Sequence, residues 1–361
     1  MKKIIFYQPI NDFNKDNINS GTLIRPKKMR GAFSKIGYEV ININGSFENR
    51  NLMVENALKQ DIEFAYFESN NTPMFLTCKN IGKIDFISDL RNIKKIKQKT
   101  KIGFYYRDNF WTESSYFKKV GFIKGILLRI CFFIEYLLLI KLVDYLFVQS
   151  EEMIESFPFS NKYRNKFKLL PPACEDYDID LYEYNPRKLN ILYSGACDDY
   201  SKYNIFPLLS KIKNSNIVNF YINSNFVEEL FNRYPEYNNI DNIYKMSVSY
   251  ENIDKLPNSY SVGIVYLNGK NRDIKKYLPI KVFYYLSLGL PILAQDNTAT
   301  GKFIKVNNIG WVYKDLNDIN SIVNNVINNP TELNEKHNNV IEFRKNQHWI
   351  NRAQEVKNIL S

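Results

Sequence analysis

The feature that most constrains the fold is an alternation of short apolar runs with segments of helical spacing, which continues along nearly the whole chain. Each apolar run has the length of a strand and ends at a polar or glycine-containing loop, after which a helical pattern usually begins. Strands that alternate with helices form parallel sheets covered by helices on both faces, so the predicted fold class is α/β, doubly wound. In the first half we expect strands at 4–7, 38–43, 62–67, 101–106 and 145–149.

A second alternation follows a change in composition. The strand–helix pattern stops near Leu170-Pro171-Pro172, and an acidic, tyrosine-rich stretch continues to Pro186. Two consecutive sheets in 361 residues indicate two Rossmann-like domains, 1–180 and 181–335, followed by a C-terminal helical segment, 336–361. In the second half we expect strands at 189–193, 218–221, 242–245, 262–266, 291–294 and 311–313, then a helix from about 332 that breaks near 347–349.

Composition excludes several classes of protein. Apolar residues make up 45% and charged residues 24% of the chain, which is typical of globular domains and not of disordered, collagen-like or coiled-coil chains. The charge of +11 favours an anionic partner, which could be a phosphorylated small molecule, an acidic membrane surface or nucleic acid. Because no RNP, helix-turn-helix or zinc motif occurs, we expect no nucleic-acid partner. Four scattered cysteines without a C-x-x-C pair argue against a zinc site and suit a reducing, cytoplasmic location.

The most apolar region, 120–148, bears on membrane contact. Charged residues interrupt it, so it lacks the uncharged stretch of roughly 18 residues that a spanning helix requires. No secretory signal opens the sequence. The segment 117–141 could instead dock on an anionic membrane, or it could form a buried helix pair of the first domain. We therefore expect a cytoplasmic protein that could be peripheral on the inner face of the cell membrane.

The motifs of several common chemistries are missing. Neither domain carries G-x-G-x-x-G after its first strand, which disfavours a dinucleotide dehydrogenase, and no G-x-x-x-x-G-K-[ST] phosphate loop occurs. Histidine occurs only at His337 and His348, which disfavours a Ser-His-Asp hydrolase and a histidine metal site. The D-x-D sequence Asp178-Ile179-Asp180 lies in the linker and not in a loop suited to Mg²⁺, so we expect no obligatory metal.

Ligands of doubly wound sheets bind beyond the carboxyl ends of the strands, and two carboxylates are expected at such ends. Glu68 follows the third strand and Asp108 the fourth, which makes them candidates for acid–base catalysis. Each has a structural alternative. Asp108 could form an ion pair with Arg107 or cap a helix, and Glu68 could cap the chain before Pro73.

The strongest local signal runs from 262 to 294. It indicates a strand, a loop, a helix that begins near Pro279, a stop at Gly289 and a further strand. Lys281 lies in the first turn of that helix, where backbone N–H groups and the positive end of the helix dipole favour an anion such as a diphosphate. The lysine adds a point charge for the same anion, unless it only stands on a solvated helix face.

This segment resembles the donor-site signature of GT-B glycosyltransferases, in the variant P-x-K-x-[FY]-E-Y-x-x-x-G-x-P. The resemblance extends over nearly the whole chain: 189–195 is similar to the strand–glycine opening of the donor domain, 308–312 to its late glycine turn, and 141–151 to the segment that closes the acceptor domain. The terminal helix with Trp349 resembles the one that crosses back to the first domain. The resemblance implies a GT-B fold of two Rossmann-like domains that face a cleft.

The resemblance also implies a hexosyltransferase-type enzyme that takes its sugar from a UDP- or GDP-linked donor, with no cofactor besides this co-substrate. Lys281, Gly195 and Lys202 would hold the donor diphosphate, and Tyr284 would stack on or hydrogen-bond to the nucleoside. Lys202 could equally be a surface lysine, and Tyr284 could serve in packing.

Gly21 and Arg25 are further candidates for donor binding. They are expected in the loop between the first strand and the first helix, where a glycine permits close approach of the backbone to a ligand. Arg25 could instead belong to a solvated basic face together with the lysines and arginine that follow it.

The sequence departs from the family at one informative place. Family-4 retaining enzymes carry two glutamates spaced E-x7-E, which contact the donor sugar and the ribose, whereas Lys276 and Tyr284 occupy those positions here. Without a donor-side carboxylate we expect Asp108 to act as the base of an inverting displacement, with Glu68 as a second carboxylate. Arg107-Asp108 and its aromatic neighbours resemble bacterial capsule and cell-envelope glycosyltransferases, which implies a lipid-linked glycan acceptor. Two alternatives are a catalytically silent GT-B subunit that scaffolds a partner enzyme and a sugar-nucleotide epimerase.

Overall fold

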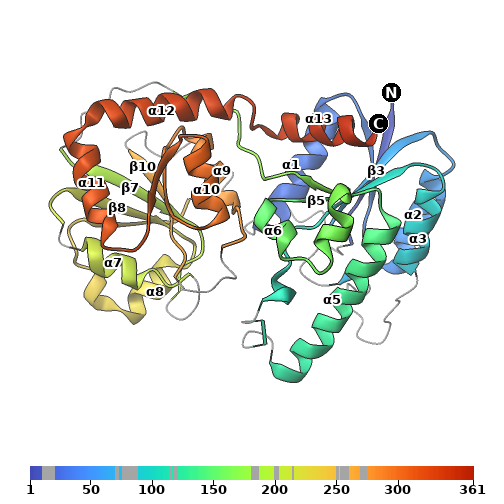
Figure 1. The fold of residues 1–361 in the computed structure, drawn as a ribbon, viewed down its shortest axis with the longest axis horizontal. Helices are drawn as coiled ribbons and strands as arrows, with labels where there is room; N and C mark the ends of the chain where they lie inside the picture. The colour runs from blue at the N-terminus through green and yellow to red at the C-terminus, as the bar shows by residue number, and fades with distance from the viewer. Residues whose placement is uncertain are drawn as a thin grey trace. The chain divides into compact units, whose positions relative to one another are not determined.

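The computed structural model divides the chain into two compact units, Met1–Pro171 with Trp349–Ser361 and Pro172–His348, each built from one parallel sheet and its helices (Figure 1). The structure describes residues 1–9, 21–69, 73–74, 88–113, 116–117, 121–179, 187–198, 203–213, 215–248, 252, 260–268 and 275–361. The two doubly wound sheets confirm the predicted fold class.

The first unit contains a six-stranded sheet in the order β2-β1-β3-β4-β5-β6. Because the chain passes from β1 to β2 on one side and returns to β3 on the other, the strand order reverses between β1 and β3. The strands are β1 (Lys3–Tyr7), β2 (Glu39–Ile43), β3 (Ile62–Glu68), β4 (Lys101–Tyr105), β5 (Tyr145–Val148) and β6 (Phe167–Leu169). Sequence patterning predicts the first five within a residue or two and misses β6, which has only three residues.

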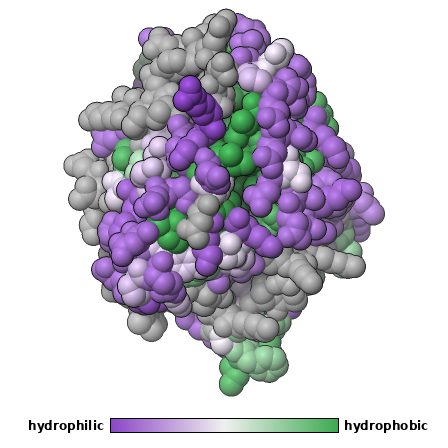
Figure 2. Space-filling model, turned by 90° about the vertical axis from the view of Figure 1, so that its left-hand side faces the viewer, coloured by the Kyte–Doolittle hydropathy of each residue, from purple (hydrophilic) through white to green (hydrophobic). Residues whose placement is uncertain are grey.

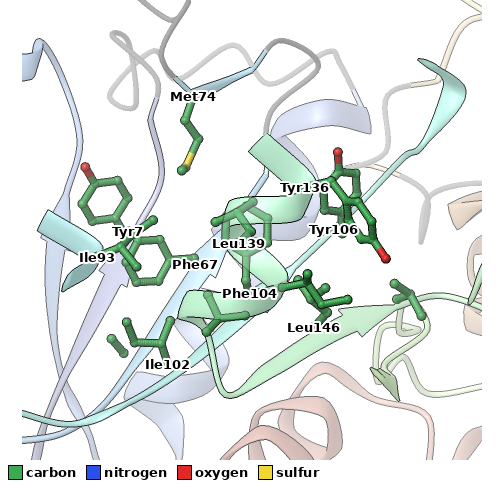
Figure 3. Close-up of a cluster of buried hydrophobic side chains, with 14 of the residues drawn as sticks. Tyr7, Phe67, Met74, Ile93, Ile102, Phe104, Tyr106, Tyr136, Leu139 and Leu146 are labelled. Carbon is green, nitrogen blue, oxygen red and sulfur yellow. The ribbon is translucent and has the colours of Figure 1, made fainter. Parts of the chain in front are cut away.

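Apolar strand residues and the inner faces of the helices form the core of the first unit. Figure 3 shows Tyr136 and Leu139 of the longest helix, α5 (Phe122–Leu142), among side chains such as Phe104 and Leu146 of the sheet. The other helices are α1 (Gly21–Lys35), α2 (Phe47–Ala57), α3 (Ser88–Lys97), α6 (Glu151–Glu155) and α13 (Trp349–Leu360), with 3₁₀ turns η2 (Phe110–Thr112) and η3 (Ser160–Lys166). Among the described residues no helix is both long and apolar enough to cross a membrane.

The second unit repeats the architecture with the order β12-β11-β10-β7-β8-β9. Its order reverses between β7 and β10, which are hydrogen-bonded neighbours. The strands are β7 (Leu189–Ser194), β8 (Val218–Asn223), β9 (Ile243–Met246), β10 (Val262–Val265), β11 (Ile292–Gln295) and β12 (Gly310–Tyr313). The helices are α7 (Phe206–Ile212), α8 (Val227–Arg233), η4 (Pro235–Tyr237), α9 (Ile280–Ser287), α10 (Ala299–Val306), α11 (Asp318–Asn328) and α12 (Pro330–Arg344).

The boundaries between the units differ from the predicted 180 and 336. The first falls between Pro171 and Pro172, because the residues that follow are tied to the end of α12: Cys174 N donates to Gln347 O at 2.9 Å, and Arg344 donates to the Glu175 carbonyl at 2.9 Å. The second falls at Trp349, so α12 stays with the second unit and only α13 belongs to the first.

The packing of α13 explains its assignment to the first unit. A Cβ atom at Gly103 of β4 would lie 2.8 Å from Leu360 Cδ1, so this strand accepts the end of α13 only because it carries a glycine there.

Candidate functional site

The donor-side candidates meet where the strand order of the second sheet reverses. β7 ends at Ser194, which lies level with Asn223 at the end of β8, and the backbone N–H of Gly195 donates to the Asn223 carbonyl at 3.0 Å. Gly195 has φ +124°, a conformation that other residues rarely adopt. Its Cβ position would lie 3.1 Å from Lys281 Nζ. The structure therefore brings Gly195 and Lys281 together, as expected if both contact one ligand.

Positive charge gathers at this place from two sources, the Lys281 ammonium group and the N-terminus of α9. Lys281 is the second residue of α9, whose N-cap is Pro279, so it lies at the positive end of the helix dipole. Its Nζ stands 4.4 Å from the centroid of the Tyr193 ring, within the range of a cation–π interaction. Tyr193 is the penultimate residue of β7, and its hydroxyl donates to the Ala196 carbonyl at 2.6 Å. A positive charge is thus positioned against the glycine-containing loop after β7, an arrangement suited to a phosphate group.

Tyr285, which the sequence analysis did not single out, fixes α9 to the sheet. Its hydroxyl accepts a hydrogen bond from the Ser194 backbone N–H at 2.8 Å and donates to the Ile264 carbonyl at 2.9 Å. The ring fits because β10 carries Gly263, whose Cβ position would lie only 2.6 Å from Tyr285 Cδ1. Burial raises the pKa of Tyr285, so its hydroxyl stays protonated and can donate. A tyrosine one turn after Lys281 and a glycine in the preceding strand are the sequence signal for this contact.

Tyr284 lies in the packed interior with 4% of its surface exposed, so its ring is not available for stacking on a nucleoside in this structure. Its hydroxyl accepts from Asn223 Nδ2 at 3.0 Å, and burial raises the pKa of this hydroxyl. The ring of Tyr284 therefore serves in packing, as the structural alternative stated. A hydrogen bond from its hydroxyl to the nucleoside stays a prediction. Lys276, which replaces the first family glutamate, is also buried, with its ammonium 5.3 Å from the Tyr277 ring centroid.

Lys202 and Gly21 are two further donor-side candidates. Lys202 lies outside the described residues. Gly21 is the first residue of α1, and the loop before it lies outside the described residues. Both stay predictions.

In the first unit, Arg25 and Glu68 form a buried ion pair. Arg25 lies inside α1 and not in the preceding loop, and its Nε is 3.3 Å from Glu68 Oε1 at the end of β3. The guanidinium also donates to Tyr66 Oη at 3.2 Å and to the Pro171 carbonyl at 3.4 Å, and its carbon stands 3.4 Å from the Tyr105 ring centroid. Arg25 is only 3% exposed, so the solvated-face alternative is wrong.

The ion pair limits the roles open to these two residues. Burial raises the pKa of Glu68, although Arg25 opposes this change. Glu68 also accepts a hydrogen bond from Tyr66 Oη at 2.8 Å, and it is 1% exposed. A substrate could reach either side chain only by displacing these partners. Their geometry favours a positioning role, and the donor-binding role of Arg25 and the catalytic role of Glu68 stay predictions.

Asp108 lies in a different environment, in the loop that follows β4. Its side chain is 34% exposed and pairs with Arg107 Nε at 3.2 Å, as one of the structural alternatives anticipates. Hydrogen bonds from two neighbouring strand ends hold the loop: the Arg107 N–H donates to Ser69 Oγ at 2.8 Å, and Gln149 Nε2 donates to the Arg107 carbonyl at 2.9 Å. Asp108 is thus a partly exposed carboxylate just after a strand end, and its catalytic role stays a prediction.

Metal binding finds no support among the described residues, where no three His, Cys, Asp or Glu side chains gather so as to hold an ion. The expectation that no metal is obligatory stays a prediction.

Comparisons with known proteins bear on the fold and on the α9 segment. Residues 244–348, which include Pro279 and Lys281, match the family model described as "Glucosyltransferase 3-like, C-terminal domain". No curated protein is detectably similar to the chain in sequence. Solved structures are similar over almost the entire length at low sequence identity.

Three of these structures illustrate the similarity. WaaG, described as a glycosyltransferase involved in lipopolysaccharide biosynthesis, has 12% identity and a TM-score of 0.59, with 100% of both chains covered. HepE of Anabaena, in complex with UDP-glucose, has 9% identity and a TM-score of 0.63, with 99% of both chains covered. An α-glucosyltransferase in complex with UDP-glucose and DNA has 14% identity and a TM-score of 0.60, with 99% of both chains covered.

These similarities define the class of fold. The chain has the two-domain GT-B fold of glycosyltransferases, and the resemblance that the sequence shows to this class is confirmed. The segment with α9 is similar to the C-terminal domain of glucosyltransferase 3-like proteins.

Proposed function

We propose that the protein is a glycosyltransferase that moves a sugar from a UDP- or GDP-linked donor to a glycan acceptor. The observation that carries this proposal is the approach of the Lys281 ammonium group to the Gly195 loop, at the reversal point of the second sheet. Ligands of doubly wound sheets bind at such points. The solved structures of similar fold with bound UDP-glucose support a nucleotide sugar as that ligand.

The chemistry follows from the charge of the leaving group. Breaking the bond between the sugar and the nucleotide diphosphate leaves negative charge on the phosphate oxygens. Lys281 and the N-terminus of α9 would stabilise that charge at fixed positions, without the cost of reorienting solvent. On the acceptor side, Asp108 would take the proton of the attacking hydroxyl, which is the requirement of a direct displacement with inverted anomeric configuration.

The acceptor in this proposal is a lipid-linked glycan of a bacterial surface polysaccharide such as a capsule, handled by a cytoplasmic protein at the inner face of the membrane. The description of WaaG, which refers to lipopolysaccharide biosynthesis, is consistent with this acceptor. The α-glucosyltransferase with bound DNA shows that the same fold occurs with a different macromolecule, so the fold alone does not select the acceptor.

A thermal-shift series with UDP, GDP and CMP tests the proposal at its donor site. A ligand that binds only the folded state at about 100 times its Kd adds about 2.7 kcal/mol of stability, so the correct nucleotide should raise Tm measurably. We expect Lys281→Ala to abolish most of this shift. Lys305→Ala is the matched control, because Lys305 lies on α10 of the same unit with its side chain 65% exposed. An equal shift in wild type and Lys281→Ala, or no shift with any nucleotide, would refute the donor site.

One observation favours a second candidate, a catalytically silent GT-B subunit that scaffolds a partner enzyme. Lys276 stands buried where family-4 enzymes carry a glutamate, so the donor side lacks that carboxylate. Nucleotide binding without sugar transfer or donor hydrolysis, across a broad panel of donors and acceptors, would support this candidate over the enzyme. No observation favours the epimerase.

A further inference from the structure

The outer face of α5 carries exposed apolar side chains from Phe122 to Leu138. The helix carries large apolar residues on two sides, and Phe132, Tyr136 and Leu139 on the inner side are buried in the core. Phe133 and Leu137 are half-buried and pack against that core. Seven large apolar side chains remain outside. They are Phe122 (70% exposed), Ile123 (76%), Ile126 (38%), Leu127 (60%), Ile130 (50%), Ile134 (44%) and Leu138 (36%).

The seven side chains lie on one side of the helix, and we call them together the α5 face. At 100° per residue they fall within an arc of roughly 160° on the helix. Exposure is greatest at the N-terminal end, where α5 leaves the body of the first unit (Figure 1). Figure 2 shows apolar side chains gathered at the lower edge of the view, at the height where α5 begins in Figure 1. Exposed apolar surfaces of this extent usually mark a binding surface.

The unit that carries the α5 face is strongly basic. The first unit contains 30 lysines and arginines and 18 aspartates and glutamates, a net +12, whereas the second contains 19 and 20, a net −1. The whole positive excess of the chain therefore lies in the unit that carries the α5 face. On the helix itself Lys124 and Lys141 are exposed, while the single acidic residue, Glu135, is buried.

We propose that the α5 face docks on an anionic lipid bilayer. An amphipathic helix that lies in the interface buries leucine, isoleucine and phenylalanine at the boundary of head groups and acyl chains, with lysines at the level of the anionic heads. The α5 face has this composition, and its helix is not one that could span the bilayer. Long-range attraction of the basic unit to the surface adds to the apolar contact.

Docking would also place the Asp108 loop at the membrane. Arg129, on the inner side of α5, donates to the carbonyls of Trp111 and Glu113 at 2.7 Å each, and the Trp111 ring stacks on Phe132. These contacts join α5 to the 3₁₀ turn η2, which begins two residues after Asp108. A lipid-linked acceptor would thus enter next to the carboxylate that we propose as the base. The docking itself does not depend on the proposed function, because it requires neither donor nor acceptor.

Sedimentation with lipid vesicles tests the proposal without any assay of activity. We expect the full chain to bind vesicles of phosphatidylcholine and phosphatidylglycerol, and to bind pure phosphatidylcholine vesicles less. The double variant F122E/L127E should lower the partition coefficient at least about tenfold, because two charges replace side chains that would enter the lipid. K124E should lower binding to the anionic vesicles about fivefold and leave binding to neutral vesicles unchanged.

Leu52→Glu is the matched control, because Leu52 is 61% exposed on α2 of the same unit and lies outside the α5 face. Unchanged thermal unfolding of each variant would show that the fold is intact. The proposal fails if the wild-type chain does not sediment with anionic vesicles, or if L52E weakens binding as much as F122E/L127E. It also fails if the chain forms a dimer that F122E/L127E dissociates while vesicles remain unbound, since a second copy would then cover the α5 face.

Discussion

Replacing Arg25 tests whether the buried ion pair with Glu68 holds the first unit together. In Arg25→Met the apolar part of the side chain is retained, but Glu68 loses the guanidinium group that lies 3.3 Å from its carboxylate, while its own side chain stays 1% exposed. Removing one partner of a buried pair typically costs 3–5 kcal/mol, because the remaining charge is uncompensated. The hydrogen bonds to Tyr66 and Pro171 are lost as well, so we expect about 4 kcal/mol at pH 7.

The loss of stability in Arg25→Met should be smaller at low pH than at pH 7. Burial already raises the pKa of Glu68, and removing Arg25 takes away the largest opposing influence, so the folded-state pKa rises further above the unfolded value near 4.5. A carboxyl group with a raised folded pKa costs stability as pH rises above its unfolded pKa. The destabilisation by Arg25→Met should therefore shrink as pH falls from 7 toward 4.5.

Urea unfolding, followed by circular dichroism at pH 7 and pH 5, measures both effects. The control is the double variant R25M/E68Q, in which no charge is left buried, so it should be less destabilised than R25M alone. A loss below about 0.5 kcal/mol for R25M would contradict the reasoning, because surface substitutions cost that little. So would a loss that is the same at both pH values.

Three other predictions follow from single contacts. Gly263→Ala should destabilise the second unit by about 1–3 kcal/mol and weaken nucleotide binding, because the new methyl group would displace Tyr285 and with it α9. Thermal unfolding would measure the first effect and nucleotide titration the second. Burial lowers the pKa of His337 from its usual 6.5 to about 4, so as pH falls the unfolded state binds the proton first. The free energy of unfolding should therefore fall by up to about 3 kcal/mol between pH 6.5 and pH 4, and His337→Gln should remove this part of the pH dependence in unfolding experiments. Asp108→Asn should keep nucleotide affinity but lose about 10² to 10⁴ in turnover, and the coupling constant of the anomeric proton in the product should show inverted configuration; near-normal turnover or a retained configuration would count against the base.

Patterns repeated along the chain made the fold predictable, whereas contacts between distant segments were not. Alternating runs of strand and helix length predicted both sheets, because buried parallel strands are almost uniformly apolar. The unit boundaries at Pro171 and Trp349 depend on hydrogen bonds between residues more than 160 positions apart, such as those of Arg344 with Glu175 and Tyr177. Local sequence patterns do not predict such hydrogen bonds.

The same distinction holds for the candidate site, where residues with a local sequence signature were predicted and residues placed by distant contacts were not. Lys281 and Gly195 were predicted because helix N-termini and glycines after strands have local signatures, and the structure places them together. Arg25 was assigned to a loop, since a single sequence does not show that an arginine of α1 will meet Glu68 of β3 in the interior. Tyr285 was overlooked because a tyrosine on an apolar helix face usually serves in packing, and only the pairing with Gly263 reveals its hydrogen bonds to two strands.

Transfer of a radiolabelled sugar from its nucleotide donor to a glycan acceptor, compared between wild type, Lys281→Ala and Lys305→Ala, tests the central claim most directly. If the ammonium group next to Gly195 stabilises the leaving diphosphate, Lys281→Ala should lose on the order of 10² or more in kcat/KM, while Lys305→Ala transfers at the wild-type rate. Transfer that persists unchanged in Lys281→Ala would contradict the assignment of the donor phosphate site.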